Sequence, residues 1–133
     1  MRRFVLKRAH NLCEYCGLSQ VGQAATFHID HIIPVTANGP TDTGNLALAC
    51  VACSLYKSAQ QTALDPLSNK PATIFNPRLD IWQEHFQWQD VQLVGLTPTG
   101  RATIKALKMN RPAILAIRQE EHFFDRHPPK WHR

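Results

Sequence analysis

The chain has 133 residues, which is enough for one compact domain and a small extension but short for a two-domain enzyme. Hydrophobic residues make up 44% and charged residues 19%, which excludes the composition of a disordered chain and predicts a folded core. Fifteen Lys and Arg against ten Asp and Glu give a net charge of +5, a balance that favours a polyanionic partner but falls far short of a histone-like charge.

The N-terminus reads Met-Arg-Arg-Phe-Val-Leu-Lys-Arg. Its apolar run is too short for a signal-peptide core or a membrane span, so we expect a cytoplasmic protein that is not bound to a membrane. In a reducing compartment, cysteines hold a metal more often than they form disulfides.

The four cysteines form two CxxC pairs, Cys13 with Cys16 and Cys50 with Cys53, and 33 residues separate the pairs. Two such pairs fit a tetrahedral zinc site with four thiolate ligands. A redox CxxC or two disulfides are the alternative, but no thioredoxin-like βαβ pattern surrounds either pair. A closed four-thiolate site leaves no position for water, so we expect this zinc to be structural.

Two strands and a helix are predicted around the second cysteine pair. Residues 25–34 alternate like a strand, residues 36–44 are turn-rich, and residues 45–50 start a second short strand. Residues 51–61 have helical composition. Residues 25–61 are therefore predicted to have the order strand, loop, strand, helix, within a unit that spans residues 1–61.

Residues 62–76 contain several Pro dipeptides and are predicted to be an irregular connector on the surface. The extension is predicted over residues 77–121, and residues 122–133, with Pro128-Pro129, are predicted to be a flexible tail.

Within the extension, Asn76-Pro77 is typical of a helix start, and a helix is expected over Arg78–His85. The candidate core contacts of this helix are Leu79, Ile81, Trp82 and Phe86. Residues 86–95 alternate and predict a strand pair, Thr97 begins a helix that ends near Asn110, and Pro112 begins another.

The middle of the chain carries one further set of motifs in a fixed order. They are His28-Ile-Asp30-His31-Ile-Ile-Pro34, then Gly39, Asn45-Leu46, Cys50-x-x-Cys53 and Lys57. With the first CxxC, this order resembles the HNH family of nucleases, also called His-Me finger or ββα-metal nucleases. A softer similarity to a small prokaryotic HNH subgroup runs from Asn76 through Arg118.

The resemblance implies an α+β fold: a ββα-metal (His-Me finger) module stapled by the four-cysteine zinc site, followed by a C-terminal α+β extension. It also implies a metal-dependent endonuclease that hydrolyses DNA phosphodiester bonds, with RNA not excluded as a substrate.

Phosphodiester hydrolysis needs a general base and a divalent cation, and His31 and Asp30 are the candidates for these roles. An imidazole suits the general base at neutral pH. Asp30 is the only carboxylate of the first strand, and Mg²⁺ or Mn²⁺ takes such oxygen ligands. Neighbouring strand residues point to opposite faces, so the strand must bend at its end if both are to act together. The resemblance assigns Asn45 to holding the loop and the base.

The third metal ligand departs from the family pattern, because Ser54 stands where Asn or His is usual. Ser54 could act through a metal-bound water. His28 and His85 are the possible substitutes as ligands.

Basic side chains are the candidates for phosphate contacts. Lys57 follows the last cysteine by one helical turn, and Arg101, Lys105, Lys108 and Arg111 would form one stripe on a helix. Affinity that falls with salt would be the sign of such contacts.

Two other functions stay open. The first is a zinc-ribbon protein that binds nucleic acid with weak or no catalysis, which the serine at position 54 favours. The second is a zinc-stabilised protein-interaction module, in which Trp82, Phe86 and Trp88 would form an exposed aromatic patch.

Overall fold

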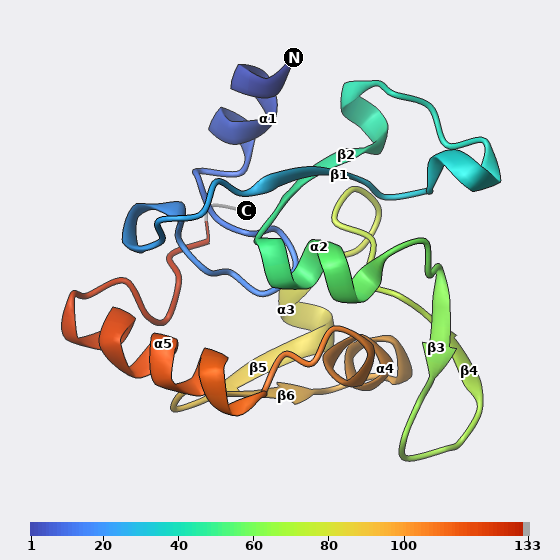
Figure 1. Cartoon of the computed structure of the whole chain (residues 1–133). Helices are drawn as coiled ribbons and strands as arrows, with labels where there is room; N and C mark the ends of the chain where they lie inside the picture. The colour runs from blue at the N-terminus through green and yellow to red at the C-terminus, as the bar shows by residue number, and fades with distance from the viewer. Residues whose placement is uncertain (132–133) are drawn as a thin grey trace.

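The computed structural model describes residues 1–131 and has the predicted mixed α and β structure. Over these residues the chain forms five α-helices and three separate two-stranded antiparallel sheets, and the β3–β4 sheet lies at the edge of the molecule (Figure 1). The helices are α1 (Arg2–Arg8), α2 (Val51–Lys57), α3 (Trp82–His85), α4 (Pro98–Ala106) and α5 (Pro112–Phe123). The strands are β1 (His28–His31), β2 (Leu46–Ala49), β3 (Thr62–Leu64), β4 (Pro71–Thr73), β5 (Phe86–Gln89) and β6 (Gln92–Gly95). None of the helices in residues 1–131 has the length and apolar character needed to span a membrane.

The strand, loop, strand, helix order predicted for the first half is confirmed. β1 pairs with β2 in antiparallel register, from His28 opposite Ala49 to His31 opposite Leu46. All four residues of β2 are buried, which makes this strand the centre of the unit. α2 follows at once and ends at Lys57, earlier than predicted, because Ser58 takes a left-handed φ of 49°.

The loop between β1 and β2 contains two short 3₁₀ turns, Val35–Ala37 and Thr43–Asn45. Gly39 packs so closely that a Cβ there would lie 1.8 Å from the carbonyl oxygen of Ile33. A side chain does not fit at this position, so the glycine permits the loop to fold back on the end of β1.

The prediction of an irregular connector over residues 62–76 is wrong. β3 and β4 form an antiparallel hairpin that packs against α4. Pro71 is tolerated because it is the first residue of its strand. The buried carboxylate of Asp65 holds the hairpin turn, since it accepts hydrogen bonds from Leu67 N and Ser68 Oγ.

The helix predicted over Arg78–His85 is confined to α3, Trp82–His85. Asn76 uses its side-chain oxygen in a turn, because Oδ1 accepts from the backbone N of Arg78 at 2.9 Å. The turn leaves Leu79 81% and Ile81 53% exposed, so the prediction that they are core contacts is wrong. Trp82 and Phe86, which follow the turn, are buried as predicted.

The strand pair β5 and β6 and the two helices after it are confirmed. α4 begins after the Thr97 cap, whose hydroxyl accepts from Gly100 N at 3.0 Å. It ends at Ala106, before the predicted end near Asn110, and Lys108 beyond it has a φ of 49°.

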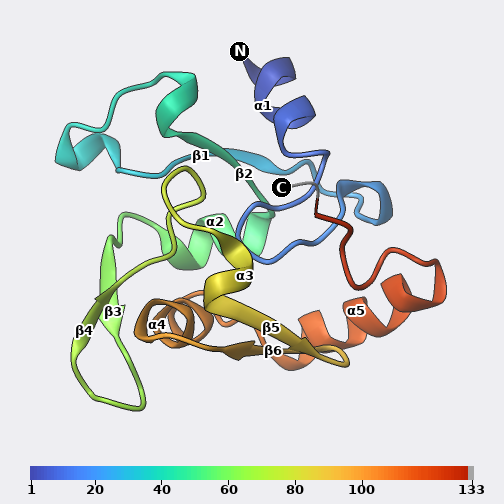
Figure 2. The ribbon, with the colours of Figure 1, turned by 180° about the vertical axis from the view of Figure 1, so that it is seen from behind.

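The chain after α5 returns to the centre of the molecule (Figure 2), so the flexible tail predicted for residues 122–133 is wrong over residues 122–131. α5 continues to Phe123, the Trp131 ring lies 5.2 Å from the Trp82 ring, and the His127 side chain bonds the carbonyl oxygen of Asp90 at 2.8 Å. Residues 132 and 133 of the predicted tail lie outside the described residues.

The aromatic side chains that the interaction-module hypothesis needs on the surface lie inside. Trp82 and Phe86 are each 2% exposed, and the rings of Trp82 and Trp88 lie 5.6 Å apart. The prediction of an exposed aromatic patch is therefore wrong, because these rings of α3 and β5 face the core.

Candidate active site

The four cysteines lie together, as their spacing predicts. The sulfur atoms of Cys13, Cys16, Cys50 and Cys53 are all within 4.8 Å of one another, and all four side chains are buried and free of disulfides. Sγ of Cys16 lies 3.8 Å from Sγ of Cys50. Zinc–sulfur bonds of about 2.3 Å in tetrahedral geometry require sulfur atoms roughly 3.8 Å apart. The donor set and its spacing therefore fit zinc.

The first cysteine pair is docked on β2 through the residue after Cys13. Glu14 N donates to the carbonyl oxygen of Leu48 at 2.8 Å, and Leu48 N donates to Oε2 of Glu14 at 2.8 Å. The other Glu14 oxygen is paired with Arg78. These contacts attach both the cysteine turn and the extension to the centre of the ββα unit.

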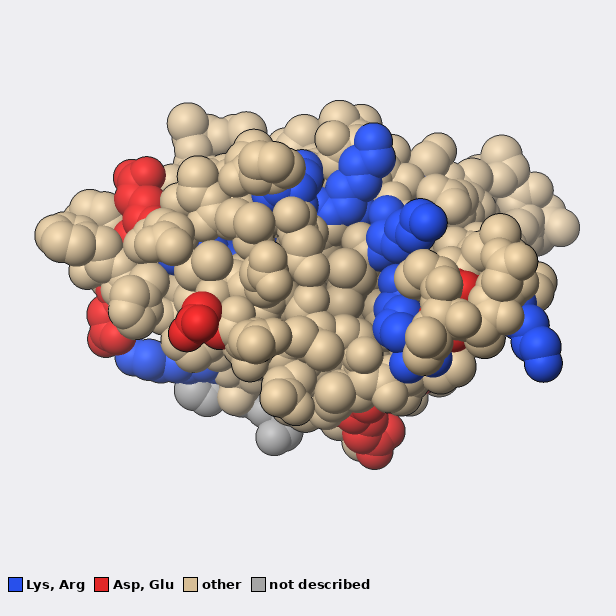
Figure 3. Space-filling view, turned by 90° about the horizontal axis from the view of Figure 1, so that it is seen from below, with Lys and Arg blue, Asp and Glu red and all other residues tan. Residues whose placement is uncertain are grey.

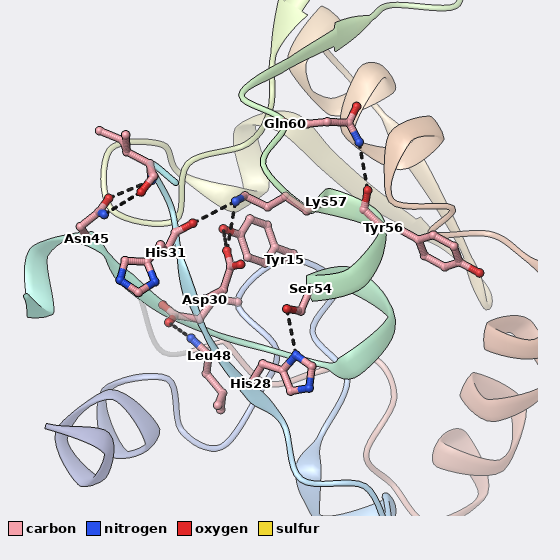
Figure 4. Close-up of polar contacts among 12 residues, drawn as sticks. Tyr15, His28, Asp30, His31, Asn45, Leu48, Ser54, Tyr56, Lys57 and Gln60 are labelled. Carbon is pink, nitrogen blue, oxygen red and sulfur yellow. Dashed lines mark hydrogen bonds and ion pairs between the residues drawn. The ribbon is translucent and has the colours of Figure 1, made fainter. Parts of the chain in front are cut away.

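Asp30 is held by two donors, neither of which is a neighbour in sequence (Figure 4). The Tyr15 hydroxyl donates to Oδ2 at 3.0 Å, and Nζ of Lys57 lies 3.2 Å from the same oxygen. Burial, and then the charge of Asp30, raise the pKa of Tyr15 well above its ordinary value, so its hydroxyl stays protonated and donates. Both donors contact the same carboxylate oxygen, Oδ2.

His31 and Asp30 leave β1 on opposite sides, as Figure 4 shows. The chain bends at Ile32 and Ile33, after β1 has ended, so this bend does not turn Asp30 and His31 to the same side of the strand as the sequence analysis required (Figure 4). Nε2 of His31 lies 2.8 Å from the hydroxyl oxygen of Thr41, which belongs to the loop between the strands.

Asn45 holds this loop, as the resemblance implies. Its side chain accepts from Ile33 N at 2.9 Å and donates to the carbonyl oxygens of Ile33 and Pro40 at 3.0 Å each. Pro40 precedes Thr41, the residue that contacts His31. The Asn45 side chain therefore ties the loop next to Thr41 to the residues just after β1.

Comparison with protein families then decides what this segment is. Residues 13–60, just over a third of the chain, match the family model described as HNH endonuclease. These residues form an HNH domain. Neither the search of curated proteins nor the search of solved structures gave a match. The family match indicates a nuclease or nucleic-acid-binding function for the domain.

Two of the candidate metal ligands in the HNH domain contact each other. Nδ1 of His28 lies 2.9 Å from Oγ of Ser54, so the side chain from β1 meets the first turn of α2 (Figure 4). The third candidate, His85, belongs to the extension and lies 2.6 Å from the hydroxyl of Thr97. The structure thus brings His28 and Ser54 together and gives His85 a structural partner at the start of α4.

The expectation that Lys57 contacts phosphate is wrong. Its side chain is 2% exposed, and Nζ donates to the carbonyl oxygen of His31 at 3.0 Å in addition to pairing with Asp30. Because it faces inward from the last turn of α2, Lys57 is an internal counter-ion of the HNH domain.

The predicted basic stripe is also corrected, because α4 ends before Lys108 and the four residues do not share one helix. Arg101 is engaged with the buried Asp65, with Nε and Nη2 each 2.9 Å from a carboxylate oxygen. Lys and Arg side chains still gather in a band on the side of the molecule that carries α4 (Figure 3). Of the predicted phosphate contacts, Lys105 and Lys108 remain as exposed candidates.

Sequence reasoning missed two residues of the HNH domain, Tyr15 and Thr41. Tyr15 lies between the first two cysteines, where its motif position points to zinc, and Thr41 lies in a loop with no periodicity. For Tyr15, the available signal was a hydroxyl that can form a hydrogen bond next to a zinc ligand. For Thr41, the sequence holds no comparable signal.

Proposed function

We propose that the chain is a metal-dependent endonuclease that hydrolyses DNA phosphodiester bonds, with a structural zinc in its four-cysteine site. The observation that carries this proposal is the arrangement of Asp30. Its carboxylate is 10% exposed, and one oxygen is committed to Lys57 and Tyr15 while the other is left for a ligand. Burial of a carboxylate is costly, so a site that holds one so firmly is a candidate functional site.

The residues present fit a divalent cation such as Mg²⁺ or Mn²⁺. Asp30 supplies a hard oxygen ligand, and His28, two residues earlier on the same face of β1, supplies an imidazole. A metal-binding histidine usually has its second ring nitrogen bonded to a polar group, and Ser54 provides such a group for His28. We therefore assign the ligand role to Asp30 and His28, and an orienting role to Ser54.

When bound, the cation would neutralise charge on the phosphate and on the leaving oxygen. His31 is the proposed general base. In the tautomer whose Nε2–H donates to the Thr41 hydroxyl, Nδ1 carries the lone pair that can take a proton from the attacking water. Asn45 maintains this arrangement because it holds the loop that carries Thr41.

Relaxation of supercoiled plasmid tests the proposal directly. Zinc-loaded protein is incubated with plasmid and Mg²⁺, Mn²⁺ or Ni²⁺, and open-circular and linear products are followed over time. We expect nicking with at least one metal, and a loss of about 100-fold or more for His31→Ala, because a general base contributes roughly 10²–10⁴-fold. Asp30→Asn should show a similar loss.

A matched control tests whether the loss of activity is specific to His31 or follows from the removal of another histidine. His122→Ala removes a histidine near the end of α5, where its ring contacts the carbonyl oxygen of His127 at 3.2 Å, and should cleave as the parent does. An RNA of the same sequence, tested in parallel, shows which nucleic acid is cut. If plasmid stays supercoiled with every metal but is still bound, the chain is a nucleic-acid-binding zinc protein and the nuclease proposal fails.

A further inference from the structure

A groove of about 380 Å³ lies between α2 and α5, next to the HNH site. Four residues of α2 form one wall: Val51, Ala52, Leu55 and Tyr56. Most of the remaining lining comes from two segments. Gln23 and Phe27 precede β1, and Arg111 and Ile117 lie at the start of α5 and within it. Its volume is in the range of sites for small organic groups.

The walls of this groove are largely apolar, yet they are open to solvent. Leu55 is 66% exposed, although it belongs to a helix whose opposite side is buried against the cysteine cluster and Asp30. An apolar surface that is lined by a few polar groups is typical of a binding site.

Two cations stand over the aromatic ring at the edge of the groove. Nζ of Lys108 lies 4.8 Å from the centre of the Tyr56 ring, and the Arg111 guanidinium carbon lies 5.7 Å from it. Both come from the turn between α4 and α5, where Lys108 has a left-handed φ of 49° and Arg111 precedes the helix. The groove therefore combines an aromatic ring with positive charge, the combination that single-stranded nucleic-acid sites use.

The groove shares structural elements with the HNH site. Phe27 directly precedes His28, and Val51 is three residues before Ser54, so both groove residues are next to the paired His28 and Ser54. A strand that passes over α2 would thus meet the groove and the proposed metal ligands in succession.

We propose that this groove binds one unpaired base of the nucleic acid, which makes strands with unpaired nucleotides the substrate class. The proposal rests on the proposed function. The base lies against Leu55 and the other apolar walls, Gln23 is available to its polar edge, and Lys108 and Arg111 contact the neighbouring phosphates. Paired bases cannot enter, because the apolar walls meet a base only when it leaves its stack.

Binding without cleavage tests this proposal on its own. Fluorescence anisotropy is measured with zinc-loaded protein and no added Mg²⁺ or Mn²⁺. The labelled ligands are a single strand, a duplex of the same sequence, and a series of single strands that each lack the base at one position. We call this series the abasic scan. We expect tighter binding of the single strand, and a loss of about tenfold at one abasic position, because contact with one base is worth roughly a factor of 5 to 150.

Variants locate the contact. Leu55→Ser and Tyr56→Ala should each weaken binding of the single strand about tenfold and make the abasic scan flat. The control Leu67→Ser changes a leucine that is 75% exposed in the β3–β4 turn, and should bind as the parent does. Lys108→Ala should reduce the slope of log affinity against log salt concentration by about one, as expected for the loss of one phosphate contact. The control Lys70→Ala should leave this slope unchanged.

The outcomes separate the two proposals. If the parent nicks plasmid but no abasic position weakens its binding, the proposal that the groove binds a base is overturned and the nuclease proposal is supported. A scan with one sensitive position but no nicking would support the groove and overturn the nuclease. Parent-like binding by folded Leu55→Ser, with one sensitive position still present, would overturn the groove as the place of contact and leave this surface to a protein partner.

Discussion

Lys57 and Asp30 form a buried ion pair across the HNH domain, with Nζ 3.2 Å from Oδ2 and side chains that are only 2% and 10% exposed. The pair joins the last turn of α2 to β1, the two elements that contribute the proposed site residues. A buried pair of this kind contributes little net stability by comparison with apolar groups, but removal of one partner is costly. Its main effect here is to orient the carboxylate.

Lys57→Met is therefore expected to destabilise the protein by about 3–5 kcal/mol, because it leaves the Asp30 charge buried without its partner. The melting temperature of the zinc-loaded protein should fall by on the order of 10 °C or more, and plasmid nicking should be lost. The double variant Lys57→Met with Asp30→Asn, which carries no unpaired charge, should recover much of the stability and none of the activity. Equal stability of the single and double variants would contradict this explanation.

Tyr15→Phe is expected to weaken the metal site while leaving the zinc site occupied. It removes only the hydroxyl that donates to Asp30, and a hydrogen bond to a charged group contributes roughly 1.5–3 kcal/mol. The concentration of Mn²⁺ that gives half-maximal nicking should rise, and the zinc content measured by atomic emission should be unchanged. Loss of zinc from Tyr15→Phe would show that the residue acts on the cysteine cluster instead.

Cys16→Ser is expected to abolish zinc binding and unfold the HNH domain. The four sulfur atoms hold the segment before β1 against the start of α2, and small metal-stapled units lose their fold with the metal. Zinc per chain should fall from one to near zero and the melting transition should disappear or broaden. Equal thermal stability of the variant and the parent in chelator-free buffer would refute a structural zinc.

The pair of Asp65 and Arg101 gives a prediction about pH. Hydrogen bonds from the Arg101 guanidinium hold the pKa of Asp65 well below its usual range. Because the folded-state pKa is lower than the unfolded one of about 3.9, the pair stabilises the fold above that value, and the effect declines as pH falls below about 4.

Asp65→Asn should consequently lower the free energy of unfolding by an amount that is constant between pH 5 and pH 8. Urea unfolding of the parent and variant at several pH values measures the difference, and zinc content is checked at each pH so that loss of metal is not mistaken for loss of the pair. A difference that disappears between pH 8 and pH 5 would contradict the lowered pKa.

Some contacts follow from spacing along the chain and were predictable. The two CxxC pairs, the strand over His28–His31 and the helix after Cys50 depend on residues only a few positions apart, so local geometry limits what they can form. Pro71 in the β3–β4 hairpin shows the limit of such reasoning. Proline generally disrupts a strand, and Pro71 is accepted only because it is the first residue of β4.

The sequence by itself determined the order of the motifs, the cysteine cluster, the ββα arrangement and the identity of Asp30 and His31 as the site candidates. Only the tertiary structure decided that Lys57 points inward to Asp30, that Tyr15 shares that carboxylate, that Ser54 meets His28, and that the chain after α5 returns to Trp82. Each of these contacts joins residues that are 15 or more positions apart. The direction of such a side chain depends on what packs around it and not on its neighbours in sequence.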